Sequence, residues 1–298
     1  MRDRLMASGD DREVFLARHV KERTTEIPYR KLLKRIEVRE TALDGHKLLI
    51  LSDPSHSSGI GLLYLYGGAF LNPPKDADFR LARTLVQKTG ADVYFPLYPL
   101  FPEAMIHEIT EFIIAAMNMM GQRYEPDRTA AIGFSSGACL ALYAYMVQKQ
   151  EGEFCRYPSR LILNSPIMRI PASEQEMAVM KRLDTLDAVL PAVFLSADGM
   201  SGLMLEKEEE RFRYLADPLS FDLSGLPETD IYAGTNEIAY AYLLETVQKL
   251  KEDGVTVNVH TGEGLMHCWG LYPGYPEAEA AQREYEEIIN RLKKDSVK

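Results

Sequence analysis

The chain has 298 residues, of which 46% are hydrophobic and 26% are charged. This composition is typical of a globular protein and excludes long disordered, collagen-like or coiled-coil architectures. The 34 Lys and Arg residues against 44 Asp and Glu residues leave a net charge of −10. That sign is wrong for binding the phosphate backbone of a nucleic acid, so we expect no nucleic-acid partner.

The cysteines and the N-terminus bear on the compartment. Cys139, Cys155 and Cys268 are too few and too widely spaced for a disulfide framework or a structural zinc site. The N-terminus mixes acidic with basic residues and lacks the apolar stretch of a secretory signal. No apolar run approaches the roughly 20 residues of a membrane span. The sequence therefore predicts a soluble, cytoplasmic protein with no membrane partner.

In chain order, the sequence predicts a helix over residues 10 to 24, then a β-hairpin. The hairpin strands are 35 to 41 and 47 to 51, on either side of the Asp44-Gly45 turn. Apolar runs bounded by Gly or Pro then predict strands buried on both faces, at 60–66, 91–97, 129–134, 161–164, 229–233 and 255–259. Helical patterns lie between and after these runs, at 79–89, 105–120, 138–149, 239–253 and 277–294. This alternation predicts an α/β protein in which helices cover both faces of a parallel sheet.

Residues 166 to 227 interrupt the alternation. Four prolines bound two helical patches in this segment, at 174–183 and 205–215, and we expect an inserted cap. The charge run from Glu206 to Arg211 predicts a solvated helix face, with Glu209 and Arg213 at the i,i+4 spacing.

A candidate nucleophile lies in the string Gly133-Phe134-Ser135-Ser136-Gly137. The string follows a predicted strand and opens a predicted helix, which is the context of a nucleophile elbow. Small residues two positions before and after the serine make room for a sharp turn. The N-terminal amides of the helix, including that of Ser136, then point at any negative oxygen formed beside Ser135.

A second glycine-containing string, Tyr66-Gly67-Gly68-Ala69-Phe70, ends an earlier predicted strand. Consecutive glycines can expose backbone N–H groups in conformations that other residues resist. An oxyanion hole needs such donors, and α/β hydrolases keep one at a strand end upstream of the elbow. We therefore expect Gly67 and Gly68 to contribute to an oxyanion hole, with a plain turn as the alternative.

A serine nucleophile needs a base, and the chain has six histidines. His267 lies in the loop between the last strand and the final helix, where the order Ser, acid, His places the base. His260, at the end of the last strand, is the alternative.

The acid should follow the strand 229–233, and Glu237 is the carboxylate in that loop. It can orient the imidazole of His267 and stabilise its protonated form. Asp230, inside the strand, and Asp217, before it, are the competitors.

With these residues in place, the sequence resembles the α/β-hydrolase fold and, within it, the hormone-sensitive-lipase-like esterases, from about residue 60 to the end. The glycine string resembles the His-Gly-Gly-Gly-Phe motif of that family, and the serine string stands at its Gly-Asp-Ser-Ala-Gly elbow. The segment Tyr98-Pro99-Leu100-Phe101-Pro102-Glu103 is similar to the family motif Tyr-Arg-Leu-Ala-Pro-Glu. The segment Asp222-Leu223-Ser224-Gly225-Leu226-Pro227 is similar to the family motif Asp-Leu-Ser-Gly-Leu-Pro. Glu237 and His267 occupy the acid and His-Gly-Phe positions. Three positions depart from the motifs: Tyr66, Ala69 and Phe134.

The resemblance implies an eight-stranded, mostly parallel sheet in one domain over residues 1–298. It also implies cap elements from about 1–34 and 166–227. Ester hydrolysis without a cofactor is the expected activity, on short acyl groups from acetyl to butyryl. A homodimer is consistent with the family, and a monomer is not excluded.

The sequence as a whole thus predicts a serine carboxylesterase in which Ser135, His267 and Glu237 are catalytic. Gly67, Gly68 and Ser136 would supply the oxyanion hole, and the substrate contacts are expected from Phe70, Leu71 and Trp269. Two alternatives stay open: a weak or inactive small-molecule-binding protein on a hydrolase scaffold, and a hydrolase of amides or peptides.

Overall fold

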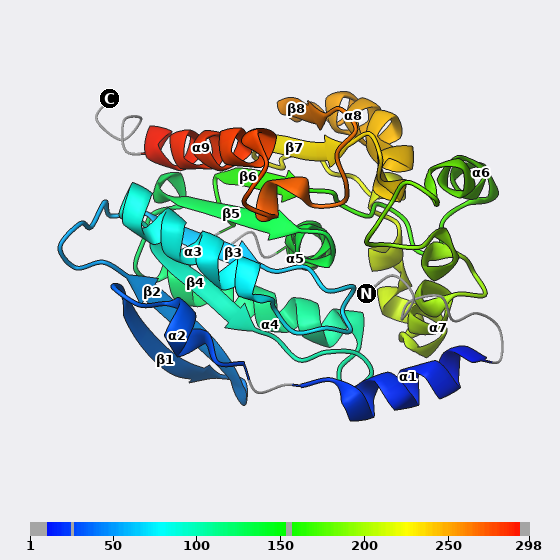
Figure 1. The fold of residues 1–298 in the computed structure, drawn as a ribbon, viewed down its shortest axis with the longest axis horizontal. Helices are drawn as coiled ribbons and strands as arrows, with labels where there is room; N and C mark the ends of the chain where they lie inside the picture. The colour runs from blue at the N-terminus through cyan, green and yellow to red at the C-terminus, as the bar shows by residue number, and fades with distance from the viewer. Residues whose placement is uncertain (1–10, 25–26, 153–156, 293–298) are drawn as a thin grey trace.

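A computed structural model describes residues 11–24, 27–152 and 157–292. Cys155, the first ten residues of the expected cap and residues 293 and 294 of the expected last helix lie outside the described residues. Eight strands form one sheet in the order β1-β2-β4-β3-β5-β6-β7-β8 (Figure 1). β1 and β2 form the predicted antiparallel hairpin, β2 is also antiparallel to β4, and the remaining pairs are parallel. The predicted mostly parallel sheet is confirmed.

Each strand lies within a few residues of its predicted place. The strands are β1 (Glu37–Leu43), β2 (His46–Ser52), β3 (Gly61–Leu65), β4 (Asp92–Leu97), β5 (Thr129–Phe134), β6 (Arg160–Asn164), β7 (Glu228–Gly234) and β8 (Val257–Gly262). β3 and β5 are buried along their whole length, because helices cover both faces of the sheet centre. The edge strand β8 is only partly buried.

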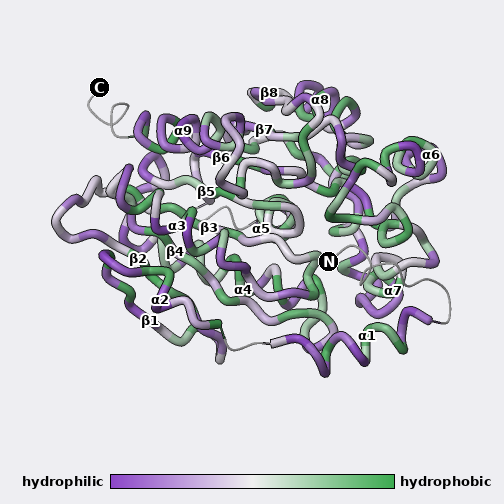
Figure 2. Tube along the Cα trace, viewed as in Figure 1, coloured by the Kyte–Doolittle hydropathy of each residue, from purple (hydrophilic) through white to green (hydrophobic). Residues whose placement is uncertain are grey.

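The helices form two layers around the sheet (Figure 1). α3 (Asp76–Thr89) and α9 (Pro276–Arg291) pack together on one face, and α4 (Ile106–Gly121) packs with α5 (Ser136–Glu151) on the other. The short α2 (Tyr29–Leu32) contacts α3, and α8 (Leu243–Glu252) contacts β8. α5 is buried on nearly every side, whereas α1 and α9 alternate between hydrophilic and hydrophobic residues (Figure 2).

Most of segment 166–227 lies beyond the carboxyl ends of the central strands (Figure 1), and its last residues return to the start of β7 at Glu228. It contains α6 (Glu174–Leu183), as predicted, and α7 (Met200–Lys207). A helix over 205–215 is wrong: α7 ends at Lys207, Glu208 is extended, and a 3₁₀ turn follows at Glu210–Ala216.

The reason for this break is the burial of Glu208, which is 4% exposed. Its Oε1 lies 2.5 Å from His107 Nδ1, and its Oε2 accepts a hydrogen bond from the His107 backbone N–H. The charge run therefore does not form one solvated helix face. Arg213 pairs with Glu210 rather than with Glu209.

α1 (Asp11–Glu22) lies beside α7 (Figure 1). The Arg12 guanidinium donates to both carboxylate oxygens of Glu206, at 2.8 and 2.7 Å. Beyond the helix, Arg23 donates to the carbonyls of Leu71 and Phe101. The N-terminal residues are thus attached both to segment 166–227 and to the loop after β3. Within the described residues, no helix combines the length and the hydropathy of a transmembrane span.

Candidate active site

Ser135 occupies a sharp turn between β5 and α5. Its backbone angles, φ 52° and ψ −121°, are unusual for a residue with a side chain, and its N–H donates to the Asn164 carbonyl on β6. A Cβ atom at Gly133 would lie 2.6 Å from Ala138 Cα, and one at Gly137 would lie 2.2 Å from the Leu65 carbonyl oxygen. The small residues on either side of the serine are therefore required by close backbone approach, as their spacing predicts.

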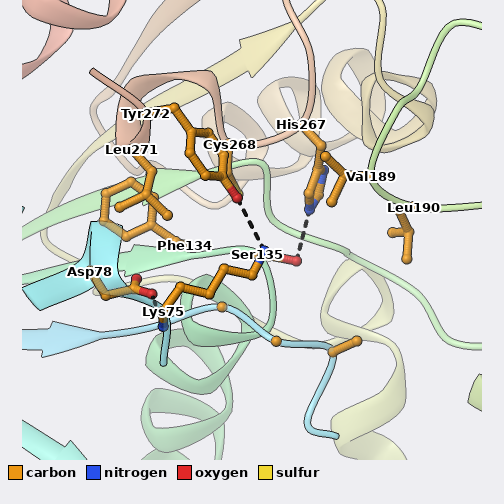
Figure 3. A pocket seen from close by; sticks show the side chains of 13 residues that line it. Lys75, Asp78, Phe134, Ser135, Val189, Leu190, His267, Cys268, Leu271 and Tyr272 are labelled. Atoms are coloured by element: carbon orange, nitrogen blue, oxygen red, sulfur yellow. Dashed lines mark hydrogen bonds between the residues drawn. The ribbon is translucent and has the colours of Figure 1, made fainter. Parts of the chain in front are cut away.

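His267 and Glu237 lie next to this serine (Figure 3). His267 Nε2 is 2.8 Å from Ser135 Oγ, and His267 Nδ1 is 2.7 Å from Glu237 Oε2. Glu237 Oε1 accepts a hydrogen bond from the Gly234 N–H at 2.9 Å, so that both oxygens of the buried carboxylate are engaged. The structure thus brings together the three side chains that the sequence selects, from the loops after β5, β7 and β8.

The surroundings of His267 change its affinity for a proton. Burial by itself lowers the pKa of the imidazole, while the neighbouring Cys268 and the Glu237 carboxylate raise it, and the net pKa lies above its ordinary value. An anion at hydrogen-bond distance stabilises the charged form of the ring. The imidazole is therefore a stronger base than a free histidine.

The alternative base and acids are engaged elsewhere. His260 Nε2 lies 3.0 Å from Asp230 Oδ1, and Asp230 also accepts two hydrogen bonds from Arg160. Asp217 pairs with Arg169. None of these groups contacts Ser135 or His267 in the described part of the chain.

The glycine string follows β3, whose neighbours β4 and β5 lie on opposite sides of it. At such a switch in strand order the loops diverge and leave a crevice at the carboxyl ends of the strands. A Cβ atom at Gly67 would lie 2.8 Å from the Phe134 carbonyl oxygen and 3.2 Å from Ser135 Cβ. Glycine at this position therefore permits the backbone of the loop to lie against the serine.

Tyr98, which the sequence places in a motif without a role, supports this loop. Its hydroxyl donates to the Tyr66 carbonyl at 2.6 Å, and the two rings stack with centroids 4.0 Å apart. Tyr66, the residue directly before Gly67, is thereby fixed by the residue that follows β4. The motif at Tyr98 was the available signal, although the pairing with Tyr66 could not be deduced from it.

Two small cavities meet at Ser135. The first also contains His267, and its other lining residues are Gly67, Gly68, Ala69, Lys75, Asp78, Phe134, Val189, Leu190, Cys268, Leu271 and Tyr272 (Figure 3). The second is lined mainly by apolar side chains and lacks His267; its other residues are Ala69, Phe70, Ser136, Cys139, Tyr143, Ile167, Ile170, Leu190, Phe194, Leu195, Ser201 and Met204. Both cavities thus take residues from segment 166–227.

Of the three expected substrate contacts, only Phe70 lines a cavity described here. The Leu71 carbonyl accepts a hydrogen bond from the Arg23 guanidinium, and the Trp269 ring packs edge to face on the Tyr232 ring. Neither residue lines the two cavities. For Leu71 and Trp269, substrate contact stays a prediction. Many of the lining residues carry no sequence motif, because their place at the site depends on how separate loops and segment 166–227 pack over the sheet.

A buried carboxyl group also lies at the first cavity. Asp78 is 1% exposed, and burial raises its pKa to about 6. Its Oδ2 accepts a hydrogen bond from the Lys75 backbone N–H, and the Tyr64 hydroxyl donates to its Oδ1. Among the described residues, no group of three or more His, Cys, Asp or Glu side chains is arranged to hold a metal ion.

Comparisons with known proteins show what the chain is similar to. The chain is 26% identical to the esterase LipU of Mycobacterium tuberculosis, over 79% of each chain. It is 27% identical to an acetyl-hydrolase of Streptomyces hygroscopicus, over 76% of this chain and 74% of the relative. Among solved structures, an esterase of the bacterial hormone-sensitive lipase family superposes with a TM-score of 0.77 at 20% identity, covering 96% of this chain and 99% of the other.

The profile of the α/β-hydrolase fold family matches residues 62–271, from β3 through the loop that carries His267. This range includes the serine turn, the acid loop and segment 166–227. The chain therefore belongs to the α/β-hydrolase fold family.

Proposed function

We propose that this protein is a carboxylic ester hydrolase that works through Ser135, His267 and Glu237. The observation that carries the proposal is the continuous chain of hydrogen-bond distances from Ser135 Oγ through the imidazole to the Glu237 carboxylate. The names of the relatives, an esterase and an acetyl-hydrolase, point to the same chemistry.

The hydrolysis has two stages. His267 Nε2 takes the Ser135 hydroxyl proton while Oγ bonds to the ester carbonyl carbon, and the π electron pair moves to the carbonyl oxygen. The tetrahedral intermediate then collapses, the bond to the alcohol oxygen breaks, and His267 gives its proton to that oxygen. A water molecule attacks the resulting acyl-enzyme in the same way, with His267 again as base. Glu237 holds the Nδ1–H of the ring and stabilises the imidazolium.

The negative carbonyl oxygen needs donors, and the proposal assigns these to the amides of Gly67, Gly68 and Ser136. Gly67 lies against Ser135, and Ser136 opens α5, where the helix dipole favours negative charge. Each such donor can contribute roughly 2.7 to 4 kcal/mol to the stability of the transition state.

The proposed preference is for small acyl groups, from acetyl to butyryl, and the second cavity supports the acetyl end of this range. Its volume is about 20 Å³, which is room for about one water-sized group such as a methyl. Longer chains need displacement of the buried side chains that close it, among them Phe194 and Met204. We further propose that segment 166–227, together with the N-terminal helix, acts as the cap of the site.

The experiment that tests the function is hydrolysis of p-nitrophenyl acetate by the wild type and by Ser135→Ala. Loss of a serine nucleophile lowers kcat by about 10⁶-fold in a hydrolase of this kind. Labelling of the wild type, but not of the variant, by a fluorophosphonate should accompany this loss. Full activity of Ser135→Ala would overturn the assignment.

A further inference from the structure

The ammonium group of Lys75 lies in the first cavity, and the hydrolysis steps above make no use of it. Lys75 is the residue directly before α3, and its side chain extends across the cavity toward Ser135 (Figure 3). Its Nζ donates a hydrogen bond to the Tyr272 hydroxyl at 3.2 Å and lies 5.8 Å from the centre of the Tyr272 ring. We call these two side chains the Lys75–Tyr272 pair.

The position of His267 decides which part of an ester meets this pair. The imidazole must give its proton to the oxygen of the departing alcohol, so the alcohol lies on the imidazole side of Ser135. His267 lines the first cavity, whereas the described lining of the second does not include it. The alcohol part therefore enters the first cavity, and the acyl part enters the second.

We propose that the substrates are esters of a small acyl group with an alcohol that carries an anionic group, which the Lys75–Tyr272 pair binds. This inference rests on the proposed function, because it uses the direction of proton transfer in ester hydrolysis. An ammonium group offers three N–H donors, and a phenol hydroxyl can donate as well as accept. Hydrogen bonds from a cation to a carboxylate or phosphate are about twice as strong as neutral ones.

The nearest carboxyl group, that of Asp78, is bound at the other end of the lysine. It accepts the hydrogen bond of the Lys75 backbone N–H at 2.8 Å, while Nζ extends away from it to Tyr272 (Figure 3). Burial raises the pKa of Asp78 to about 6 and the charge of Lys75 opposes that rise, so the carboxyl is mostly ionised at neutral pH and still interacts with the lysine. Several other lining residues, among them Leu271 and Val189, are apolar and strengthen a charge–charge contact by excluding water.

The pair also selects against some alcohols. A cationic alcohol such as choline would lie beside the ammonium of Lys75, and like charges at close range are unfavourable. A neutral alcohol gains nothing from the ammonium. We therefore expect kcat/KM to fall in the order anionic, neutral, cationic for acetyl esters of comparable size.

The test uses acetyl esters that differ in one charge. The substrates are 2-, 3- and 4-acetoxybenzoate, each compared with the acetoxybenzamide of the same ring position. The variants are Lys75→Met, which removes the charge and keeps the length, and Lys75→Arg, which keeps the charge. Lys88→Met is the matched control, because Lys88 is exposed at the last turn of the same helix.

For the best of the three isomers, the ratio of kcat/KM for the acid to that for the amide should fall about 10- to 100-fold in Lys75→Met. Lys75→Arg should keep most of the ratio, and Lys88→Met should leave it unchanged. An equal ratio in the wild type and Lys75→Met for all three isomers, with hydrolysis still dependent on Ser135, overturns the anion site and leaves the proposed function standing.

If no acetyl ester is hydrolysed, the proposed function fails, and a binding measurement decides the anion site by itself. Calorimetric titration with 4-hydroxybenzoate should then give a dissociation constant at least about 10-fold weaker for Lys75→Met than for the wild type. Equal affinity of the two proteins for 4-hydroxybenzoate overturns the anion site.

Discussion

Phe134 stands where the related motif has an aspartate, directly before Ser135. The side chain is fully buried and packs edge to face on Tyr285, whose hydroxyl is hydrogen-bonded to Asn164 Oδ1. Asn164 also accepts the Ser135 N–H through its backbone carbonyl. Aromatic packing and the Asn164 contact thus occupy the place of the polar contact that an aspartate would supply.

The pH dependence of activity is the first prediction at this scale. His267 must be neutral to accept a proton, so kcat/KM for p-nitrophenyl acetate rises with pH through the pKa of its imidazole. Because that pKa is raised, the acid limb should lie above the ordinary value of about 6.5. Glu237→Gln removes the carboxylate that stabilises the imidazolium; the limb should move to lower pH and kcat should fall by about 10⁴-fold.

The matched control for this profile is Glu263→Gln, an exposed carboxylate in the loop that carries His267. It removes the same charge and should shift neither the limb nor kcat. A limb that stays in place in Glu237→Gln would contradict the role of this carboxylate.

The second residue-scale prediction concerns acyl length. Met204 is 1% exposed and closes the second cavity, so Met204→Ala should extend the space for the acyl chain. Relative to acetate, kcat/KM for p-nitrophenyl hexanoate should rise about 10-fold, since one methylene in an apolar pocket changes specificity by that order. Leu203→Ala, at a buried neighbour outside this lining, should not change the ratio. An unchanged ratio in Met204→Ala would show that the acyl group lies elsewhere.

At the scale of elements, the break after α7 connects segment 166–227 to α4. Glu208→Ala removes the carboxylate that lies 2.5 Å from His107 Nδ1 and leaves the ring only the exposed Glu209, 3.8 Å from its Nε2, so we expect a cost of about 3 kcal/mol. Urea unfolding should report this cost. Because α7 also carries Ser201 and Met204 of the second cavity, acyl-length selectivity should become broader.

Glu210→Ala is the control for the connection, because the Glu210 side chain is 84% exposed and pairs only with Arg213 among the described contacts. Its effect should stay within about 0.5 kcal/mol. Similar stabilities for Glu208→Ala and Glu210→Ala would mean that the His107 contact does not hold α7.

For the molecule as a whole, apolar burial rather than ion pairing should hold the N-terminal helix. Leu16 is 5% exposed within the common core, and Leu16→Ala should cost about 2 to 5 kcal/mol in the free energy of unfolding. The Arg12–Glu206 pair is partly solvated, so Arg12→Ala should cost less than about 1 kcal/mol. A larger cost for Arg12→Ala than for Leu16→Ala, measured by urea unfolding, would reverse this ranking.

The sequence by itself determined the order of the strands and helices along the chain, and it identified the residues of the serine turn. Periodicity reports how one element faces its surroundings, and Gly133 avoids a clash with Ala138 only a few residues away. Gly137 instead avoids the Leu65 carbonyl of the neighbouring strand, although its spacing from Ser135 marks it in the sequence. The positions of Glu237 and His267 followed from strand ends, because parallel strands bring their carboxyl ends to one edge of the sheet.

Tertiary structure alone decided the rest. Lys75 and Tyr272 meet across 197 positions of sequence, and Glu208 turns inward to a histidine 101 positions away. No periodicity encodes such contacts, since they depend on how separate loops and helices pack over the sheet. For the same reason, much of the wall of the second cavity came from the packing of segment 166–227 on the strand ends, while the reacting atoms came from local motifs.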